Sequence, residues 1–305
     1  MCHGPRALSA RHGTDGSPLR TGIDLHVHSR FSDGRYSPAR LADLAAAANL
    51  RGFALTDHDG LGGLDEAARA ARGKGLRLVP GVELSCRCQQ HDLHLLGWFV
   101  DAHSVPLRRA LFRLAEARRR RLHAMIQALQ EQGIPLDEEE VLERNDGPVT
   151  GRPHLAAALV AAGRARSVQD AFQRWLNPGR PGFIRLDRLP ASRAIELIRG
   201  SGGVSGIAHP GLQVPDAIVL RLAAQGLDAI EVDHPSHDPR QRRHYRALAR
   251  RLDLTPAAGS DFHGDRQRHA RLGAERLSDA GQAALEARRP GGTIRSEDPV
   301  QCDPD

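Results

Sequence analysis

The chain has 305 residues and a formal net charge of +6, from 43 basic and 37 acidic side chains. Hydrophobic residues make up 40% and charged residues 26% of it, a composition that excludes a disordered chain and favours a soluble globular protein. No run of about 18 apolar residues occurs, so we expect no membrane span. We also expect no secretory signal, because Met1 to Thr21 contains no apolar segment.

Two features of the composition concern function. The four cysteines, Cys2, Cys86, Cys88 and Cys302, follow no disulfide or zinc-knuckle pattern, which favours a reducing cytoplasm. Lys74 is the only lysine, so nearly all the basic side chains are arginines. Arginine suits phosphate recognition, but a GC-rich genome produces the same bias. The 16 histidines tell more, because several stand in short clusters with carboxylates.

The first half of the chain alternates between predicted strands and helices. Residues 1–21 are predicted to be a flexible leader. Gly22 to His28 alternates, with His26 and His28 on its polar face, and predicts a strand. A helix opening at Ser37-Pro38, a strand at 52–56, a helix at 64–72 and strands at 76–83 and 91–100 follow. Such alternation favours a parallel sheet.

A helical segment interrupts this pattern. Residues 107–132 predict one long amphipathic helix, and two shorter helices are expected near 153–162 and 168–176. Strands and helices alternate again after Leu189. We therefore predict one α/β domain made of 22–103 and 188–290, a small helical insert at 104–187 and a polar tail at 291–305.

Histidines and carboxylates stand where predicted strands end. They are His26, His28, Asp33, Asp57, His58, Glu83, His209, Asp261 and His263, with His94 inside a further strand. In a parallel barrel these ends converge on one mouth, where active sites lie. Such a group would be unstable without counter-charge, which divalent metals supply. Imidazole with carboxylate suits Mn, Fe or Zn.

The chain resembles the PHP (polymerase and histidinol phosphatase) superfamily. The resemblance lies in nine short segments: Asp24 to Ser29, Ser32 to Gly34, Leu55 to Asp59, Pro80 to Ser85, His94 to Gly97, Ala208 to Pro210, Glu231-Val232, His234 to His237 and Gly259 to Gly264. Within the superfamily it is most similar to the TrpH-type phosphoesterases, which include nucleoside 3′,5′-bisphosphate phosphatases and RNase AM-type 5′→3′ exoribonucleases. It implies a distorted (β/α)7 TIM-like barrel with three divalent metals, usually Mn²⁺.

Carried over by motif, the resemblance implies a role for each position. One metal would take His26, His28, Glu83 and Asp261. Glu83 would bridge to a second metal, which also takes His94 and His209, and a third would take Asp33, His58 and His263. Of the residues expected to be catalytic, His58, Asp261 and His263 are also ligands, and Asp57 would orient a ligand imidazole.

The expected activity is hydrolysis of phosphate esters in nucleotides or short 5′-phosphorylated RNA. Arg152, His154 and Arg180 are expected to hold the substrate's other phosphate or its nucleoside, and His237 is a weaker candidate. We expect the run from Arg118 to Arg121 to form a solvent-exposed helix face rather than a nucleic-acid-binding surface. Two alternatives stay open: another barrel metal hydrolase of the amidohydrolase kind, or a non-enzymatic RNA-binding protein. No obligate protein partner is indicated.

Overall fold

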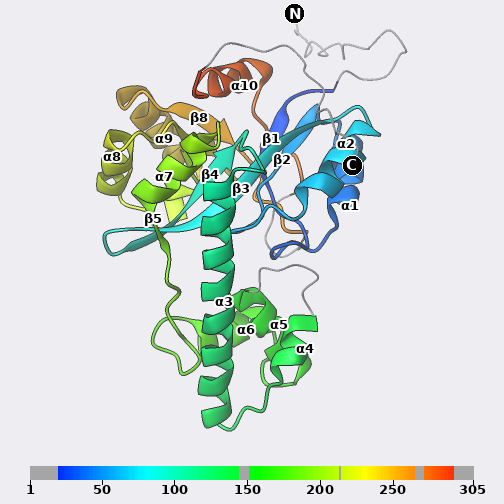
Figure 1. Ribbon diagram of the computed structural model, residues 1–305. Coiled ribbons are helices and arrows are strands. Elements are labelled where there is room, and N and C mark those ends of the chain that lie inside the picture. The colour runs from blue at the N-terminus through cyan, green and yellow to red at the C-terminus, as the bar shows by residue number, and fades with distance from the viewer. Residues whose placement is uncertain (1–19, 144–150, 213, 265–270, 292–305) are drawn as a thin grey trace, which may run out of the picture.

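A computed structural model describes residues 20–143, 151–212, 214–264 and 271–291 (Figure 1). Almost all of the predicted leader and of the polar tail lies outside these residues. None of the helices in the described ranges is both long and apolar enough to cross a membrane.

A central sheet joins eight strands of the described chain, and most neighbouring pairs run parallel. Its order is β1-β2-β3-β4-β6-β7-β8, and the short β5 pairs with β3. The strands are β1 (Ile23–Val27), β2 (Gly52–Leu55), β3 (Arg77–Cys88), β4 (His91–Trp98), β5 (Leu189–Pro190), β6 (Val204–Ile207), β7 (Ala229–Asp233) and β8 (Thr255–Ala258). This α/β fold is consistent with a PHP or TIM-like barrel.

The strand β4 departs from the parallel sheet that the sequence predicted. It runs antiparallel to both of its neighbours, β3 and β6. Only Gln89 and Gln90 connect β3 to β4, and Gln89 has the positive φ of a tight turn, +54°. A parallel pair needs a crossover of a dozen or more residues, so this short connection dictates a hairpin. The prediction was wrong here because it weighed alternation along the chain and overlooked connection length.

Hydrophobic cores lie on both sides of the sheet. The inner core takes residues from β1, β2, β3, β4, β6, β7 and β8, including Leu25, Trp98 and Ala257. The Trp98 indole N–H donates to the carbonyl oxygen of Leu25, 2.8 Å away, which ties β4 to β1. Beyond the end of β8, the amide of His28 donates to the carbonyl of Phe262 at 3.0 Å. The first and last strands therefore lie close together.

Helices cover the outside of the sheet (Figure 1). Those that follow strands are α1 (Pro38–Ala47), α2 (Leu64–Arg72), α7 (Ala191–Gly200), α8 (Asp216–Ala224) and α9 (Pro239–Arg251). The last helix, α10 (Asp279–Glu286), lies instead over the end of the sheet opposite the helical segment, and its Leu285 packs in the core that contains Leu25 and Trp98. Ser37 caps α1 by accepting from the Arg40 amide, and Pro38 occupies its first turn, as the sequence indicated. A single-turn 3₁₀ helix, Pro210–Leu212, follows β6.

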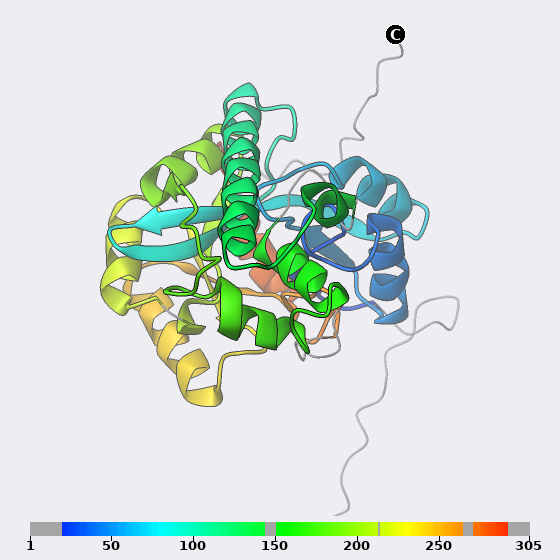
Figure 2. The same ribbon diagram turned by 90° about the horizontal axis from the view of Figure 1, so that it is seen from below.

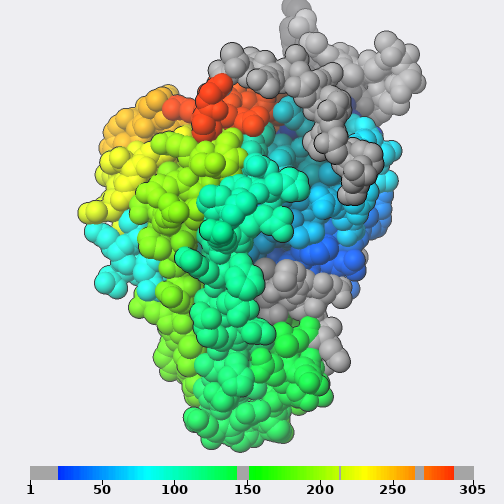
Figure 3. Space-filling model, viewed as in Figure 1, coloured from blue at the N-terminus to red at the C-terminus, as the bar shows by residue number. Residues whose placement is uncertain are grey.

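The helical segment projects from one end of the sheet (Figures 1 and 3). It contains α3 (Val105–Glu131), α4 (Glu138–Glu143), α5 (Arg152–Ala161), α6 (Val168–Ala171) and a π-helical turn, Phe172–Leu176. Seen from below, α5 and α6 lie across the end of the sheet (Figure 2). The first half of α3 packs in the outer core through Leu107 and Leu111, whereas Leu122 and Met125 belong to a separate core with α5. The helix α3 therefore contributes to two separate hydrophobic cores.

The packing of β6 against Trp98 yields a stability prediction. A Cβ at Gly206 would lie 2.5 Å from two carbons of the buried Trp98 ring. We expect Gly206→Ala to lower the free energy of unfolding by about 1–3 kcal/mol, because the ring must move within a filled core. Urea denaturation followed by circular dichroism measures this.

Gly200→Ala is the matched control. Gly200 ends α7, and a Cβ there meets no atom within 4 Å. Alanine at this position should leave stability unchanged or raise it by up to about 1 kcal/mol. Equal stability of the two variants would contradict the close contact between β6 and the indole.

Candidate metal centre

Three elements bring the first group of histidines and carboxylates together. His26 lies in β1, Glu83 lies within β3, and Asp261 follows β8. Nε2 of His26 lies 3.3 Å from both Glu83 Oε2 and Asp261 Oδ1. Nε2 of His28 lies 3.2 and 3.3 Å from the same two oxygens. Atoms that share one ion at about 2.0–2.2 Å lie roughly 3.0–3.5 Å apart, so this spacing suits a metal.

The other oxygen of Glu83 faces a second pair of imidazoles. Oε1 lies 2.9 Å from His94 Nδ1 and 3.2 Å from His209 Nε2. Glu83 and His94 lie inside their strands rather than at strand ends, because the β3–β4 hairpin continues past the mouth of the sheet. The hairpin therefore carries both side chains into the cluster.

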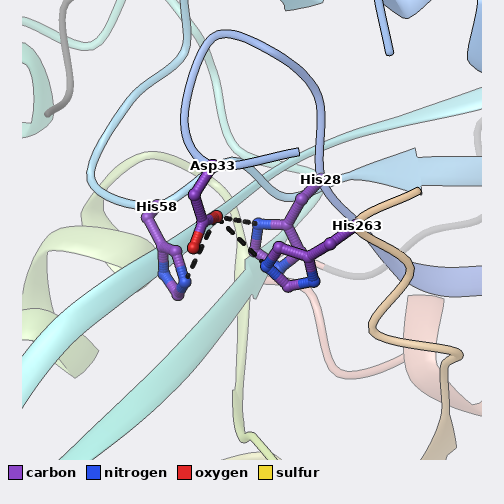
Figure 4. Close-up of side chains that lie close together, drawn as sticks. All are labelled: His28, Asp33, His58 and His263. Atoms are coloured by element: carbon purple, nitrogen blue, oxygen red, sulfur yellow. Dashed lines mark ion pairs between the residues drawn. The ribbon is translucent and has the colours of Figure 1, made fainter. Parts of the chain in front are cut away.

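Asp33 gathers the third group (Figure 4). Its Oδ1 lies 3.1 Å from His263 Nε2, 3.8 Å from His58 Nε2 and 3.9 Å from His28 Nδ1. His58 also links this group to Glu83, because its Nδ1 lies 3.0 Å from Oε2. All nine predicted ligand residues thus lie in one continuous cluster.

The cluster has the electrostatics of a cation site. Burial would raise the pKa of Glu83, but attraction from His58, His94 and His26 holds it well below its usual range. Within the described chain, Nε2 of His26, both nitrogens of His28 and Oδ1 of Asp33 are buried with no hydrogen-bond partner. Buried polar atoms without partners are costly, and shared cations would satisfy them. The donor set therefore fits divalent metals.

The backbone is strained at two of these positions. His209 has φ +29° and Asp261 has φ +51°, in the region that non-glycine residues rarely adopt. Such conformations cluster at functional sites, where the surrounding structure enforces them. Here they follow β6 and β8, directly at the mouth of the sheet.

Comparisons with known proteins assign the family. A model of the PHP domain matches residues 24–176. A 3′,5′-nucleoside bisphosphate phosphatase of Chromobacterium violaceum is 35% identical over 79% of this chain and 87% of its own. A 5′-3′ exoribonuclease of Escherichia coli is 32% identical over 79% of this chain and 84% of its own. This chain belongs to the PHP family.

A solved structure supports the same assignment. It is a Bifidobacterium adolescentis protein described by a proposed activity, that of a metal-dependent phosphoesterase. It superposes with a TM-score of 0.82 at 31% identity and covers 90% of this chain and 98% of its own. The family expected from the sequence is therefore confirmed, and so is an α/β fold with a mostly parallel sheet.

Two residues of this PHP domain were missed as site residues by the sequence reasoning. Glu231 Oε1 lies 3.0 Å from His26 Nδ1, and its Oε2 accepts from the His209 amide. Glu231 thus orients the His26 ring with Nε2 inward. Nδ1 of His234 accepts from the Ser236 amide, which turns Nε2 toward Asp261 Oδ2 at 3.5 Å. The available signal was that both residues stand in segments that carry the family resemblance, Glu231-Val232 and His234 to His237.

Asp57 has different partners from those expected. Its two oxygens accept hydrogen bonds from Ser29 and from the Ser32 hydroxyl, at 2.6–2.8 Å. The Asp57 carboxylate therefore binds serine donors, whereas the sequence analysis expected it to bind an imidazole. It orders the turn that presents Asp33, and Glu231 takes the imidazole-orienting contact.

An arginine-lined cleft of about 270 Å³ opens beside the cluster of the PHP domain. Arg118, Arg121, Arg152 and Arg188 line it together with Asp33, His58 and His94. Burial, with the charges of Arg152, Arg118 and Arg188, lowers the pKa of Arg121 to about 9. This excess of partly buried positive charge favours an anion. Arg118 and Arg121 stand three apart and turn inward, whereas Arg119 and Arg120 are exposed.

The residues predicted to bind substrate lie in different places. Arg152 and His154 line the arginine-lined cleft. Nδ1 of His154 accepts from the Gly151 amide at 3.0 Å, so this ring also caps α5. Arg180 is exposed on the turn after Asn177. Both nitrogens of the buried His237 contact backbone, Nδ1 at the Val232 carbonyl and Nε2 at the Gly211 amide.

The Arg118–Asp59 ion pair yields a second stability prediction. Nε of Arg118 donates to Asp59 Oδ2 at 2.7 Å, and the Asp59 side chain is fully buried. We expect Arg118→Met to lower the free energy of unfolding by about 3 kcal/mol, because it leaves a buried carboxylate without its cation. Urea denaturation measures the loss.

A double-mutant cycle supplies the control. Adding Asp59→Asn to Arg118→Met removes the stranded charge and should recover much of the stability. If the losses from the two single changes simply add, the ion pair contributes nothing and the prediction is wrong.

Proposed function

We propose that this chain is a metal-dependent phosphoesterase that hydrolyses nucleotides with two phosphates, such as 3′,5′-bisphosphates, or short 5′-phosphorylated RNA. One observation carries the proposal: a continuous histidine–carboxylate cluster opens beside a cleft lined by four arginines. The named activities of the two relatives agree with it. A phosphate ester bound there would meet positive charge on both sides.

We propose three metal ions, held as the family motifs imply. His26, His28, Glu83 and Asp261 would hold the first; Glu83, His94 and His209 the second; and Asp33, His58 and His263 the third. Contacts of Glu83 with His28 and His94, and of Asp33 with His263, agree with this division, while His58 also contacts Glu83 and His28 also faces Asp33. Mn²⁺ is the proposed ion, and Fe or Zn also suits the ligands.

When bound, such ions neutralise phosphate oxygens and lower the pKa of a water toward about 7. The protein's own residues set the geometry. Glu231 fixes the His26 ring. The contacts between Ser29 and Asp57 fix the turn that carries Asp33. His234 places its Nε2 beside Asp261. Orienting contacts of this kind tune ligand basicity and position.

The arginine-lined cleft is the proposed site of the second phosphate. Arg152 lines it, and its guanidinium lies 5.6 Å from the centre of the Phe172 ring. Arginine pairs bidentately with phosphate oxygens, which suits a terminal phosphate. We retain Arg152 as a substrate residue and give His154 the task of shaping the cleft. Arg180 and His237 are not included, because one is exposed and the other is bound to backbone.

We further propose that the sheet closes as a distorted barrel and that the helical segment is an insertion domain. Two observations support closure: the bridge between Val27 and Phe262, and the inner core to which seven strands contribute side chains. The separate core around Leu122 and Leu155 supports an inserted body that begins part-way along α3. The unpaired, buried Cys86 and Cys88 support a reducing cytoplasmic setting. A nucleotide or short RNA is the only partner we propose.

Metal removal tests the function. Phosphate release from adenosine 3′,5′-bisphosphate should disappear after dialysis against EDTA and return with Mn²⁺. Glu83→Gln should lower kcat/KM by more than about 100-fold and reduce the bound metal measured by elemental analysis, because Glu83 contacts five imidazoles.

Glu196→Gln is the matched control. Glu196 is exposed on α7 and pairs with Arg193, so activity and metal content should be unchanged. Hydrolysis of amides but of no phosphate ester would favour the amidohydrolase alternative. Salt-dependent RNA binding without hydrolysis, unaffected by EDTA, would favour the RNA-binding alternative.

The arginine-lined cleft gives a specificity prediction. Arg152→Ala should raise KM for a nucleoside bisphosphate about 10- to 100-fold, which corresponds to one charge-assisted hydrogen-bonded contact. KM for the matching nucleoside 3′-monophosphate should change much less, since it lacks the second phosphate. Steady-state kinetics on both substrates measures this. Arg119→Ala on the exposed face of α3 is the control, and an equal effect of both variants would contradict the assignment.

A further inference from the structure

A second cleft adjoins the histidine–carboxylate cluster on another side. It has a volume of about 390 Å³ and is lined by His94 and His209 of the cluster. Phe183, Leu186, Val214 and Asn177 line its outer part, so we name it the Phe183 cleft. It shares Arg121, Arg152 and Arg188 with the arginine-lined cleft. The two clefts therefore meet beside His94.

The two clefts differ in chemistry. Both clefts contain Leu186. The arginine-lined cleft adds Ser32, Ser85 and Arg118, with Pro153 and Phe172, and the Arg152 guanidinium covers the Phe172 ring at 5.6 Å from its centre. The Phe183 cleft adds apolar side chains and one amide, Asn177, although Arg185 and Asp92 also line it. Phe183 is half-buried, and the Arg121 guanidinium lies 6.0 Å from the centre of its ring. An aromatic face with a guanidinium beside it is a stacking surface.

We propose that the Phe183 cleft binds the nucleobase of the substrate, by stacking on the Phe183 ring and the Arg121 guanidinium. This inference rests on the proposed function, since it assumes that the phosphate ester lies at the histidine–carboxylate cluster. Unpaired bases stack on aromatic side chains and on arginine planes in single-strand recognition.

The three adjoining sites provide one place for each charged or aromatic group of a nucleoside bisphosphate. Its ribose carries two phosphates and one base, which leave the sugar in three directions. The cluster, the arginine-lined cleft and the Phe183 cleft converge on His94, Arg121 and Arg152. One ester then lies at the cluster, the second phosphate lies among the arginines, and the base lies against Phe183.

Stacking also predicts how selective the Phe183 cleft is toward different bases. Every base has a π-face, so stacking tolerates different bases. The cleft therefore selects a nucleotide over a sugar phosphate, with little preference among the four bases.

The experiment compares two substrates that differ only in the base. Adenosine 3′,5′-bisphosphate is set against the abasic ribose 3,5-bisphosphate, with the Mn²⁺-loaded full chain. Phe183→Ala should raise KM for the first about 10- to 100-fold and leave kcat and the abasic KM unchanged. Phe183→Tyr should restore the wild-type KM, because it keeps the ring. Phe112→Ala is the control: Phe112 is 68% exposed on α3 and lines a different cleft.

A binding measurement separates this inference from the proposed function. Calorimetric titration of adenosine 3′,5′-bisphosphate into EDTA-treated protein reports the base contact without hydrolysis. Weaker binding by Phe183→Ala, with no phosphate release by the wild type, would sustain the cleft and refute the phosphoesterase. An equal loss on both substrates, or no loss on either, would overturn the nucleobase assignment while the hydrolytic activity stands.

Discussion

The site depends on one buried carboxylate. Glu83 has no solvent exposure, and its two oxygens lie 2.9–3.3 Å from the rings of His26, His28, His58, His94 and His209. A buried charge at this depth is tolerated only with compensating charge around it. Protonated imidazoles could provide it, but five of them around one carboxylate would repel each other. Divalent cations between the rings and the oxygen atoms resolve both problems, since they need neutral imidazoles and ionised carboxylates.

Glu83 can occupy this position because β3 extends beyond the end of its neighbour β2. Residues of β3 as far as Pro80 pair with β2, and the strand then continues as a hairpin with β4. This extension carries Glu83 and Ser85 on one face and brings His94 opposite Ser85. Ser85 in turn holds Asp59 through its amide and receives the Arg118 guanidinium on its hydroxyl. The same hairpin thus fixes the centre of the cluster and one wall of the arginine-lined cleft.

Sequence patterns predicted the cluster better than its surroundings. The alternation in β1 placed His26 and His28 on one face, and turn residues after β2 and β8 marked Asp57, His58, Asp261 and His263. The antiparallel β4 was missed because connection length was not weighed. Glu231 and His234 were missed as site residues because their contacts, to His26 and Asp261, cross the sheet between distant segments. Asp57 was assigned an imidazole because nothing in the sequence shows that Ser29 and Ser32 fold back onto it.

The four-arginine run shows where sequence reasoning reached its limit. A basic run on a helix is usually a solvated face, and Arg119 and Arg120 fit that interpretation. Arg118 and Arg121 turn inward because α3 has two packed sides: its first half packs in the outer core of the sheet and its second half in the separate core with α5. Between those two contacts, Arg118 binds Asp59, which follows β2. Arg121 donates to the carbonyl of Ile184, 2.6 Å away, in the segment that leads back to the sheet. A helix held at both ends in this way keeps its arginines at a fixed distance from Glu83. The helical segment therefore affects the chemistry at the sheet, because any tilt of α3 would move positive charge relative to the cluster.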